Sequence, residues 1–144
     1  MANILDRFNK SVIGTKGRIA DYSSIISSKG DFKRVVDINT IILSWNNILL
    51  TPTRSYTFDP EYGCDLYKMV FEPADDLTIE KIKDEIINKI QRYDNRAIIT
   101  NIDVVFLSNM KGFSLSLKVE YKGEESELNV IIDEILYAKY MEAV

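Results

Sequence analysis

Apolar residues recur every three or four positions in two stretches of the chain, 37–51 and 78–93. This spacing places apolar side chains on one face of an amphipathic helix. The apolar positions are Ile38, Ile41, Ile42, Trp45, Ile48 and Leu49 in the first stretch, and Ile79, Ile82, Ile86, Ile87, Ile90 and Tyr93 in the second. We therefore predict two helices that pack on a core, with Trp45 as a core residue. Charged residues such as Glu85 and Lys89 are assigned to the solvated face of the second helix.

The predicted helices begin and end at residues with suitable chemistry. Asp37 and Thr78 are the predicted N-caps, since their side chains can accept hydrogen bonds from first-turn amides. Pro52 ends the first helix because proline disfavours helical geometry in the residue before it. The turn-prone residues Asp94 and Asn95 end the second helix, and Asn95 is expected in a left-handed conformation.

After the second helix, the period of the apolar pattern changes to two. Residues 113–121 alternate cleanly between apolar and polar side chains, and two flanking segments alternate less strictly. Such alternation predicts strands with one buried and one solvated face. We expect an antiparallel meander with strands near 99–107, 113–121 and 126–133, followed by a short helix over 134–144. The predicted fold class is α+β, with amphipathic helices packed on one face of a small three-stranded meander.

A meander of this kind has at least one unpaired edge, which is a template for another chain's strand. Two interpretations are open. The N-terminal segment or a helix covers the edge, or a partner adds a strand to it and binds through backbone hydrogen bonds.

Residues 1–30 show the least regular pattern, with three glycines and a cluster of serines. They predict an irregular N-terminal extension, followed by a single domain over 31–144. Lys10, Lys16 and Arg18 make this segment mildly basic. It is either a mobile extension or an arm that becomes ordered against a partner.

Composition excludes several classes of function. The chain has 144 residues and a net charge of −4, which argues against a nucleic-acid-binding protein. It contains no histidine, which excludes histidine catalysis and imidazole metal sites, and its single cysteine, Cys64, excludes zinc frameworks. No nucleotide-binding glycine motif, long apolar run or signal-peptide pattern occurs. We expect no cofactor, no metal, no membrane partner and synthesis in the cytoplasm.

A turn-rich stretch at 58–72 forms a predicted elbow between the two helices. Pro60 fixes φ, Gly63 is free to adopt positive φ, and Asp59 can bond back to the backbone. Asp65 is the expected N-cap of a short helical piece that follows. The elbow residues are Phe58, Asp59, Pro60, Gly63 and Asp65. On these residues alone, the elbow is a buried structural turn that delivers a small helix to the core.

The same stretch carries a resemblance to a known family. Its sequence Phe-Asp-Pro-Glu-Tyr-Gly-Cys-Asp-Leu, followed shortly by Phe-Glu, resembles the signature of small baseplate wedge proteins of contractile-tailed bacteriophages and type VI secretion systems. The likeness extends over 31–136. The family's Glu-Pro-Arg motif corresponds here to Asp94, Asn95 and Arg96, so the acid is shorter and the proline is lost. A second departure lies at 52–56, where the family often has a Gly-Glu-Arg-like turn and this chain has Thr53-Arg54-Ser55-Tyr56.

The resemblance implies an architectural role in the virion, at the tail baseplate, and no enzymatic activity. Asp94, Asn95 and Arg96 would bind the helical core bundle of the wedge, and Arg96 would pair with an acidic or carbonyl group there. The protein would act as sheath initiator, because the family's sheet accepts strands from the first sheath ring. Other wedge subunits, the tail sheath protein and tail tube or hub proteins are the implied partners.

Two other functions compete with this one. Members of the family are often described as lysozyme-like, and a glycosidase needs two carboxylates about 5–10 Å apart. The acids close together in the elbow are Asp59, Glu61, Asp65 and Glu72. The third possibility is a generic α+β adaptor unrelated to phage tails.

Overall fold

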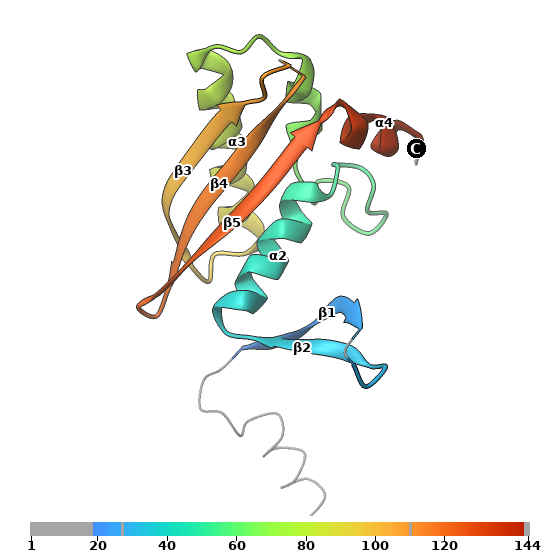
Figure 1. Ribbon diagram of the computed structural model, residues 1–144, viewed down its shortest axis with the longest axis vertical. Helices are drawn as coiled ribbons and strands as arrows, with labels where there is room; N and C mark the ends of the chain where they lie inside the picture. Colours follow the sequence, from blue (N-terminus) through green and yellow to red (C-terminus); the bar gives the residue numbers. More distant parts are fainter. Residues whose placement is uncertain (1–18, 27, 110, 143–144) are drawn as a thin grey trace, which may run out of the picture. The chain divides into compact units, whose positions relative to one another are not determined.

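The computed structural model describes residues 19–26, 28–109 and 111–142, and its elements are shown in Figure 1. The chain divides into two compact units, Met1–Thr40 and Ile41–Val144. The predicted organisation into an extension over 1–30 and one domain over 31–144 stays a prediction. None of the helices in the described ranges is long and apolar enough to cross a membrane.

The first unit contains an antiparallel hairpin of β1 (Ala20–Ile26) and β2 (Phe32–Val36). The expected irregularity up to residue 30 is therefore wrong for β1. The strand was missed because its large apolar side chains do not mark a buried face: Tyr22 and Ile26 are 64% and 68% exposed. Its pairing rests on the backbone ladder, which shifts register between these two residues. Residues 1–18 of the predicted extension lie outside the described residues.

The two predicted helices are present, and their ends differ partly from prediction. Helix α2 spans Ile38–Leu50 as expected, directly after Asp37. Helix α3 spans Asp76–Tyr93 and begins two residues earlier than predicted. Its N-cap is Asp75, whose carboxylate accepts a hydrogen bond from the Thr78 amide at 2.8 Å. The prediction of a Thr78 cap was wrong because Asp75, itself a strong cap residue, starts the helix first.

The C-terminal end of α3 also corrects a prediction. The non-glycine residues with positive φ in the described part of the chain are Asp37, Arg54 and Lys122, so Asn95 is not left-handed. The helix ends instead at Asp94, which has a φ of −153° and whose amide still donates to the carbonyl of Ile90 at 2.8 Å.

The meander consists of β3 (Ile98–Phe106), β4 (Gly112–Tyr121) and β5 (Glu124–Asp133), in that spatial order and antiparallel throughout. A final helix, α4 (Glu134–Glu142), follows as predicted. Four alternate side chains of the central strand are fully buried: Phe113, Leu115, Leu117 and Val119. The intervening polar residues face the other side, so the α+β class and the half-buried meander are confirmed.

The core of the second unit lies against the buried face of this sheet. Helix α3 runs behind the sheet in Figure 1, and the short 3₁₀ helix η1 (Leu66–Phe71) contacts β4 and β5. The largest fully buried side chains of the helices are Trp45, Ile41, Ile48, Leu66, Ile82, Ile86 and Ile90. Trp45 is thus a core residue, as predicted.

Candidate interaction site

The predicted elbow is a tight loop closed by backbone hydrogen bonds. The Arg54 amide donates to the carbonyl of Pro60 at 2.8 Å, and the Tyr62 amide donates to the carbonyl of Asp59 at 3.1 Å. The Asp59 carboxylate accepts from the Glu61 amide at 3.1 Å, which is the local bond expected of an aspartate in a turn. Arg54 is held at a φ of 67°, an uncommon conformation for a residue with a Cβ.

Gly63 lies where the elbow meets the end of α2. Its φ is 100°, the positive value anticipated from the sequence. The next amide, that of Cys64, donates to the carbonyl of Thr51 at 2.9 Å. A Cβ at position 63 would lie 2.1 Å from the Thr51 oxygen, so no other residue fits without moving the backbone.

Phe58 contradicts the idea of a buried turn, since 90% of it is exposed. Its ring lies edge-on against Tyr56, with 5.8 Å between centroids, and Tyr56 meets Tyr62 at the same spacing. Tyr62 in turn contacts Tyr93 at the end of α3, at 5.2 Å. An aromatic row therefore leads from α3 to the tip of the elbow. No pattern in the sequence indicated that Phe58 lies at the exposed end of this row.

Asp65 precedes η1 but does not cap it with its side chain. Its φ of −94° and ψ of 24° are not the extended values that aim a capping carboxylate at first-turn amides. The carboxylate instead accepts a hydrogen bond from the Thr53 hydroxyl and pairs with Lys68 at 3.4 Å. The predicted side-chain cap was wrong, and the Asp65 carboxylate instead joins the elbow to Thr53 in the preceding loop.

A stripe of charged residues on α3 contacts the elbow. The Asp65 amide donates to the Glu85 carboxylate at 3.2 Å, and the Lys89 ammonium donates to the Glu61 carbonyl at 2.9 Å. Arg92 pairs with the Glu61 carboxylate. Glu85 and Lys89 were assigned to solvent because their partners lie far away in sequence. The spacing of 85, 89 and 92, which puts three charges on one helical stripe, was the available signal.

At the end of α3, Asp94 and Arg96 form a bidentate ion pair. The Arg96 Nε and Nη2 atoms each donate to one carboxylate oxygen of Asp94 at 2.6 Å. Asp94 is 5% exposed, and its carbonyl also accepts from the Trp45 indole at 3.2 Å. Burial acts to raise the pKa of Asp94, but hydrogen bonds from Arg96 and Ser44 outweigh it and hold that pKa below its ordinary value.

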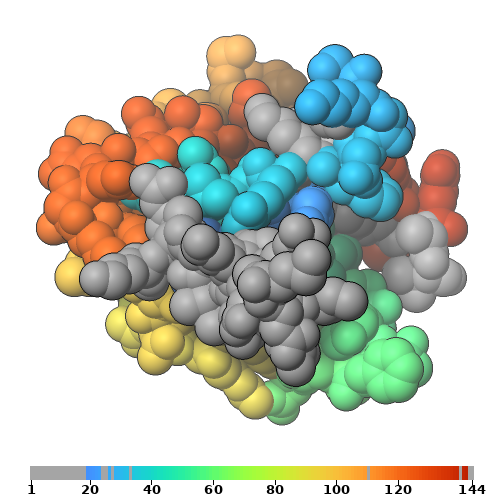
Figure 2. Space-filling model, turned by 90° about the horizontal axis from the view of Figure 1, so that it is seen from below, coloured from blue at the N-terminus to red at the C-terminus, as the bar shows by residue number. Residues whose placement is uncertain are grey.

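The three residues of this motif therefore lie in different environments. Asp94 is inside, whereas Asn95 and Arg96 are exposed. The Arg96 guanidinium pairs with an acid of its own chain, whereas the resemblance implied an acidic or carbonyl group of a partner. Figure 2 shows that the segment around the end of α3 (yellow) and the elbow (green) both reach the surface on this face.

The acids of the elbow do not make a convincing catalytic pair. Glu61 and Glu72 are exposed, and they pair with Arg92 and with Lys81, the latter at 4.0 Å. A glycosidase acid instead needs an apolar pocket. The Cys64 thiol is buried, and desolvation together with nearby Glu85 raises its pKa to about 12, far from that of a nucleophile. No metal-binding group of three or more acids or cysteines occurs among the described residues.

The chain matches a family model over residues 39–127, and the family is described as baseplate wedge protein gp25. A curated relative, baseplate wedge protein gp25 of Enterobacteria phage T4, is 33% identical over 66 residues. That alignment covers 46% of this chain and 50% of the relative, so the chain spans about half the length of the relative it matches.

Solved structures share the fold at lower identity. A chain of the anti-feeding prophage baseplate aligns with a TM-score of 0.58 at 13% identity, over 80% of this chain and 85% of that one. A chain of the post-contraction baseplate of pyocin R2 gives 0.52 at 20% identity, over 81% and 99%. A candidate tail lysozyme from Geobacter sulfurreducens gives 0.55 at 15% identity, over 76% and 93%.

Proposed function

Because the chain belongs to the baseplate wedge protein gp25 family, we propose that it is a structural subunit of a contractile-tail baseplate that joins the wedge to the first sheath ring. The observation that carries this proposal is the family match over 39–127, which spans the elbow, α3 and most of the meander. In this role the protein resides in the virion tail baseplate, acts as a wedge subunit and sheath initiator, and catalyses no reaction.

The wedge contact is assigned to Asp94, Asn95 and Arg96. Asp94 holds the guanidinium of Arg96 in one orientation through two hydrogen bonds, which reduces the side-chain entropy lost when a partner binds. The guanidinium side chain is 39% exposed, and guanidinium groups recognise carboxylates and carbonyls in fixed geometry. Asp94 is then a positioning residue, and Asn95 and Arg96 contact the helical core bundle of the wedge.

The sheath contact is assigned to an edge of the meander. Strands β3 and β5 are the two edges of this sheet, and each has peptide groups directed away from β4. A strand extended from the first sheath ring would pair with one of them. Adding a strand to a preformed sheet avoids the entropy of assembling that sheet during initiation.

An affinity pull-down tests this function. Tagged wild type, Arg96→Ala and the control Arg92→Ala are incubated with lysate of the source, and recovered proteins are identified by mass spectrometry. We expect wild type and Arg92→Ala to recover wedge and sheath proteins, and Arg96→Ala to lose the wedge proteins alone. Arg92 is a suitable control because its guanidinium also pairs with an acid of its own chain.

Two outcomes would contradict the proposal. Recovery of no tail protein by a well-folded wild type would favour the generic adaptor. Hydrolysis of peptidoglycan by the wild type, abolished in Asp65→Asn or Glu72→Gln, would favour the glycosidase.

A further inference from the structure

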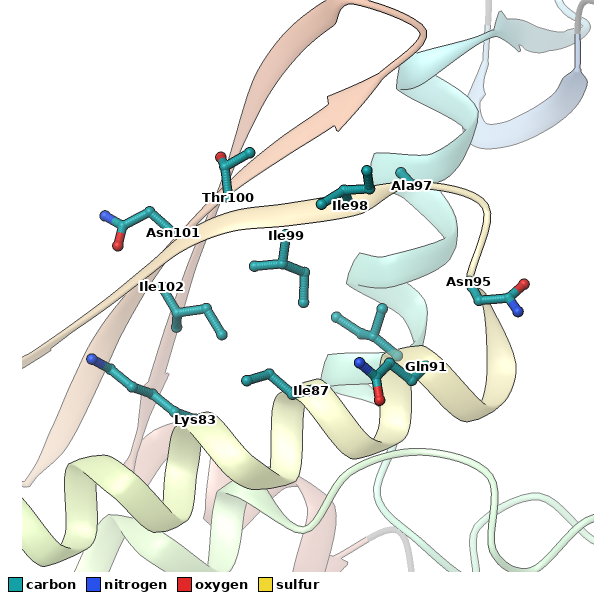
Figure 3. Close-up of a pocket in the computed structure, with 11 residues that line it drawn as sticks. Lys83, Ile87, Gln91, Asn95, Ala97, Ile98, Ile99, Thr100, Asn101 and Ile102 are labelled. Carbon is teal, nitrogen blue, oxygen red and sulfur yellow. The ribbon is translucent and has the colours of Figure 1, made fainter.

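A small pocket between the elbow and α3 is distinguished by its charge. We call it the elbow pocket, and its charged lining consists of Arg54, Lys68, Lys89 and Arg92, with the acids Glu61 and Asp65. Another pocket, between α3 and β3, has a largely aliphatic lining whose charged residue is Lys83 (Figure 3). The elbow pocket is therefore the one that suits a charged ligand.

The positive charge of the elbow pocket is only partly balanced. Its two acids neutralise two of its four cations, in the pairs Glu61 with Arg92 and Asp65 with Lys68. The Lys89 ammonium donates to the Glu61 carbonyl at 2.9 Å, and a carbonyl carries no net charge. Within the described part of the chain, neither Lys89 nor Arg54 forms an ion pair with an acid. Two cations thus lack a counter-charge, and a concave surface lined by such charges attracts anions.

Arg54 is the residue of this pocket whose backbone is strained. Its φ is 67°, and its amide is held by the Pro60 carbonyl at 2.8 Å. A side chain in this region costs free energy that glycine would avoid, and such strain is concentrated at ligand-binding sites. The residue is exposed, and its guanidinium makes no hydrogen bond or ion pair with the other described residues. Its N–H donors are therefore open to a partner, in a conformation that the fold maintains at a cost.

The surroundings of Arg54 favour a protein as this partner. Tyr56 and Phe58 follow on the same loop and are 49% and 90% exposed. Arginine and aromatic residues are the side chains that dominate binding energy in protein interfaces. The volume of the pocket is about 300 Å³, at the lower limit of pockets that hold small organic ligands, so a single side chain fits. The net charge of −4 disfavours a nucleic acid, which is an extended polyanion.

We propose that the elbow pocket binds a carboxylate side chain in an acidic segment of a partner protein. The Arg54 guanidinium holds the carboxylate through two N–H donors, and the Lys89 ammonium supplies a second positive charge. An apolar residue next to the acid packs on Tyr56 and Phe58. This contact goes beyond the proposed function and is separate from it, since it uses neither the 94–96 motif nor an edge of the meander.

Nuclear magnetic resonance of the isotope-labelled full chain measures this binding with a defined probe. The probe is a blocked peptide with two adjacent glutamates followed by leucine and phenylalanine, and its control has glutamines in place of the glutamates. We expect the amide signals of 53–62 to shift with a Kd of about 1 mM or tighter, and the control peptide to bind at least about fivefold more weakly. Added salt should weaken binding of the glutamate peptide, because ions screen the charges.

Two substitutions and a matched control test the pocket itself. Arg54→Gly should weaken binding at least about fivefold, whereas its melting temperature should not fall, because glycine adopts a φ of 67° without strain. Lys68→Gln should also weaken binding, since it removes positive charge from the pocket. Lys111→Gln is its control, because Lys68 and Lys111 are 58% and 57% exposed and each pairs with an acid, at 3.4 and 3.3 Å. We expect Lys111→Gln to bind like wild type.

Four results would overturn the proposal. The glutamate peptide does not bind, or it binds no more tightly than the glutamine peptide, so that no carboxylate is recognised. Binding persists at wild-type affinity in both Arg54→Gly and Lys68→Gln, which places the site elsewhere. Inorganic phosphate or a single-stranded DNA oligonucleotide binds more tightly than the glutamate peptide, which assigns the pocket to phosphate groups. None of these results affects the proposed function, which the pull-down of tail proteins tests independently.

Discussion

The elbow and the end of α3 both join charged side chains within one chain, but under different degrees of burial. At the elbow, the side chains of Arg92 and Glu61 are 59% and 63% exposed. At the end of α3, the Asp94 side chain is 3% exposed and that of Arg96 is 39% exposed. Exposed pairs contribute little to stability, whereas a buried acid depends on its partner. The elbow must therefore owe its shape to its backbone, and the end of α3 to its ion pair.

The largest loss of stability is expected from substituting Gly63, which tests directly whether the elbow depends on its backbone. In Gly63→Ala, the new Cβ meets the carbonyl of Thr51 at 2.1 Å, and the backbone has a φ of 100°. Strain of this kind costs about 1–3 kcal/mol, and displacement of the Thr51 carbonyl adds to it. We expect a melting temperature lower by at least about 5 °C, measured by calorimetry.

Gly123→Ala is the control for that experiment. Gly123 also has a positive φ, 80°, but a Cβ there would meet no atom within 4 Å. Its substitution therefore reports backbone strain without a clash, and the drop in stability should be smaller. If the melting temperature fell equally in the two variants, the elbow would not depend on the close contact between Gly63 and Thr51.

The second-largest loss of stability is expected from substituting the buried acid Asp94, and this loss should depend on pH. The pKa of Asp94 in the folded state lies below its ordinary value, since Arg96 and Ser44 bond the ionised form despite burial. Its contribution to stability is therefore fully present above the unfolded pKa, near 3.9, and is lost as pH falls through the lower folded pKa. Removing the charge should cost the protein about 1–2 kcal/mol at neutral pH, because the partial exposure of Arg96 reduces the effect.

Denaturant titrations of wild type and Asp94→Asn from pH 2 to pH 7 measure this contribution. We expect the difference between the two proteins to be constant above about pH 5 and to shrink as pH falls below about 4. A difference that stays constant across the whole range would show that the loss arises from packing of the amide, with no part played by the ionised pair.

The sequence predicted those parts of the fold in which one side of an element is buried. The isoleucines of α3 and the alternation of β4 reflect such faces, so both elements were placed closely. The exposed hairpin strand β1 carried no such pattern. The elbow was predicted as a turn from Pro60 and Gly63, but its contacts with Glu85 and Lys89 join residues far apart in sequence. The ion pair of Asp94 with Arg96 was not predicted, because the family resemblance implied that Arg96 pairs with a group of a partner.

The smallest effect is expected from breaking the exposed pair of the elbow. In Arg92→Ala, the bond to Glu61 is lost, and exposed pairs contribute about 0–1 kcal/mol. We expect a change in the free energy of unfolding below about 1 kcal/mol, decreasing further in 0.5–1 M salt because ions screen exposed charges. Denaturant titrations of wild type, Arg92→Ala and Asp94→Asn at low and high salt measure the change in free energy and its dependence on salt. If Arg92→Ala destabilised the protein as much as Asp94→Asn, the elbow would be held by its charges, and the contrast with the end of α3 would fail.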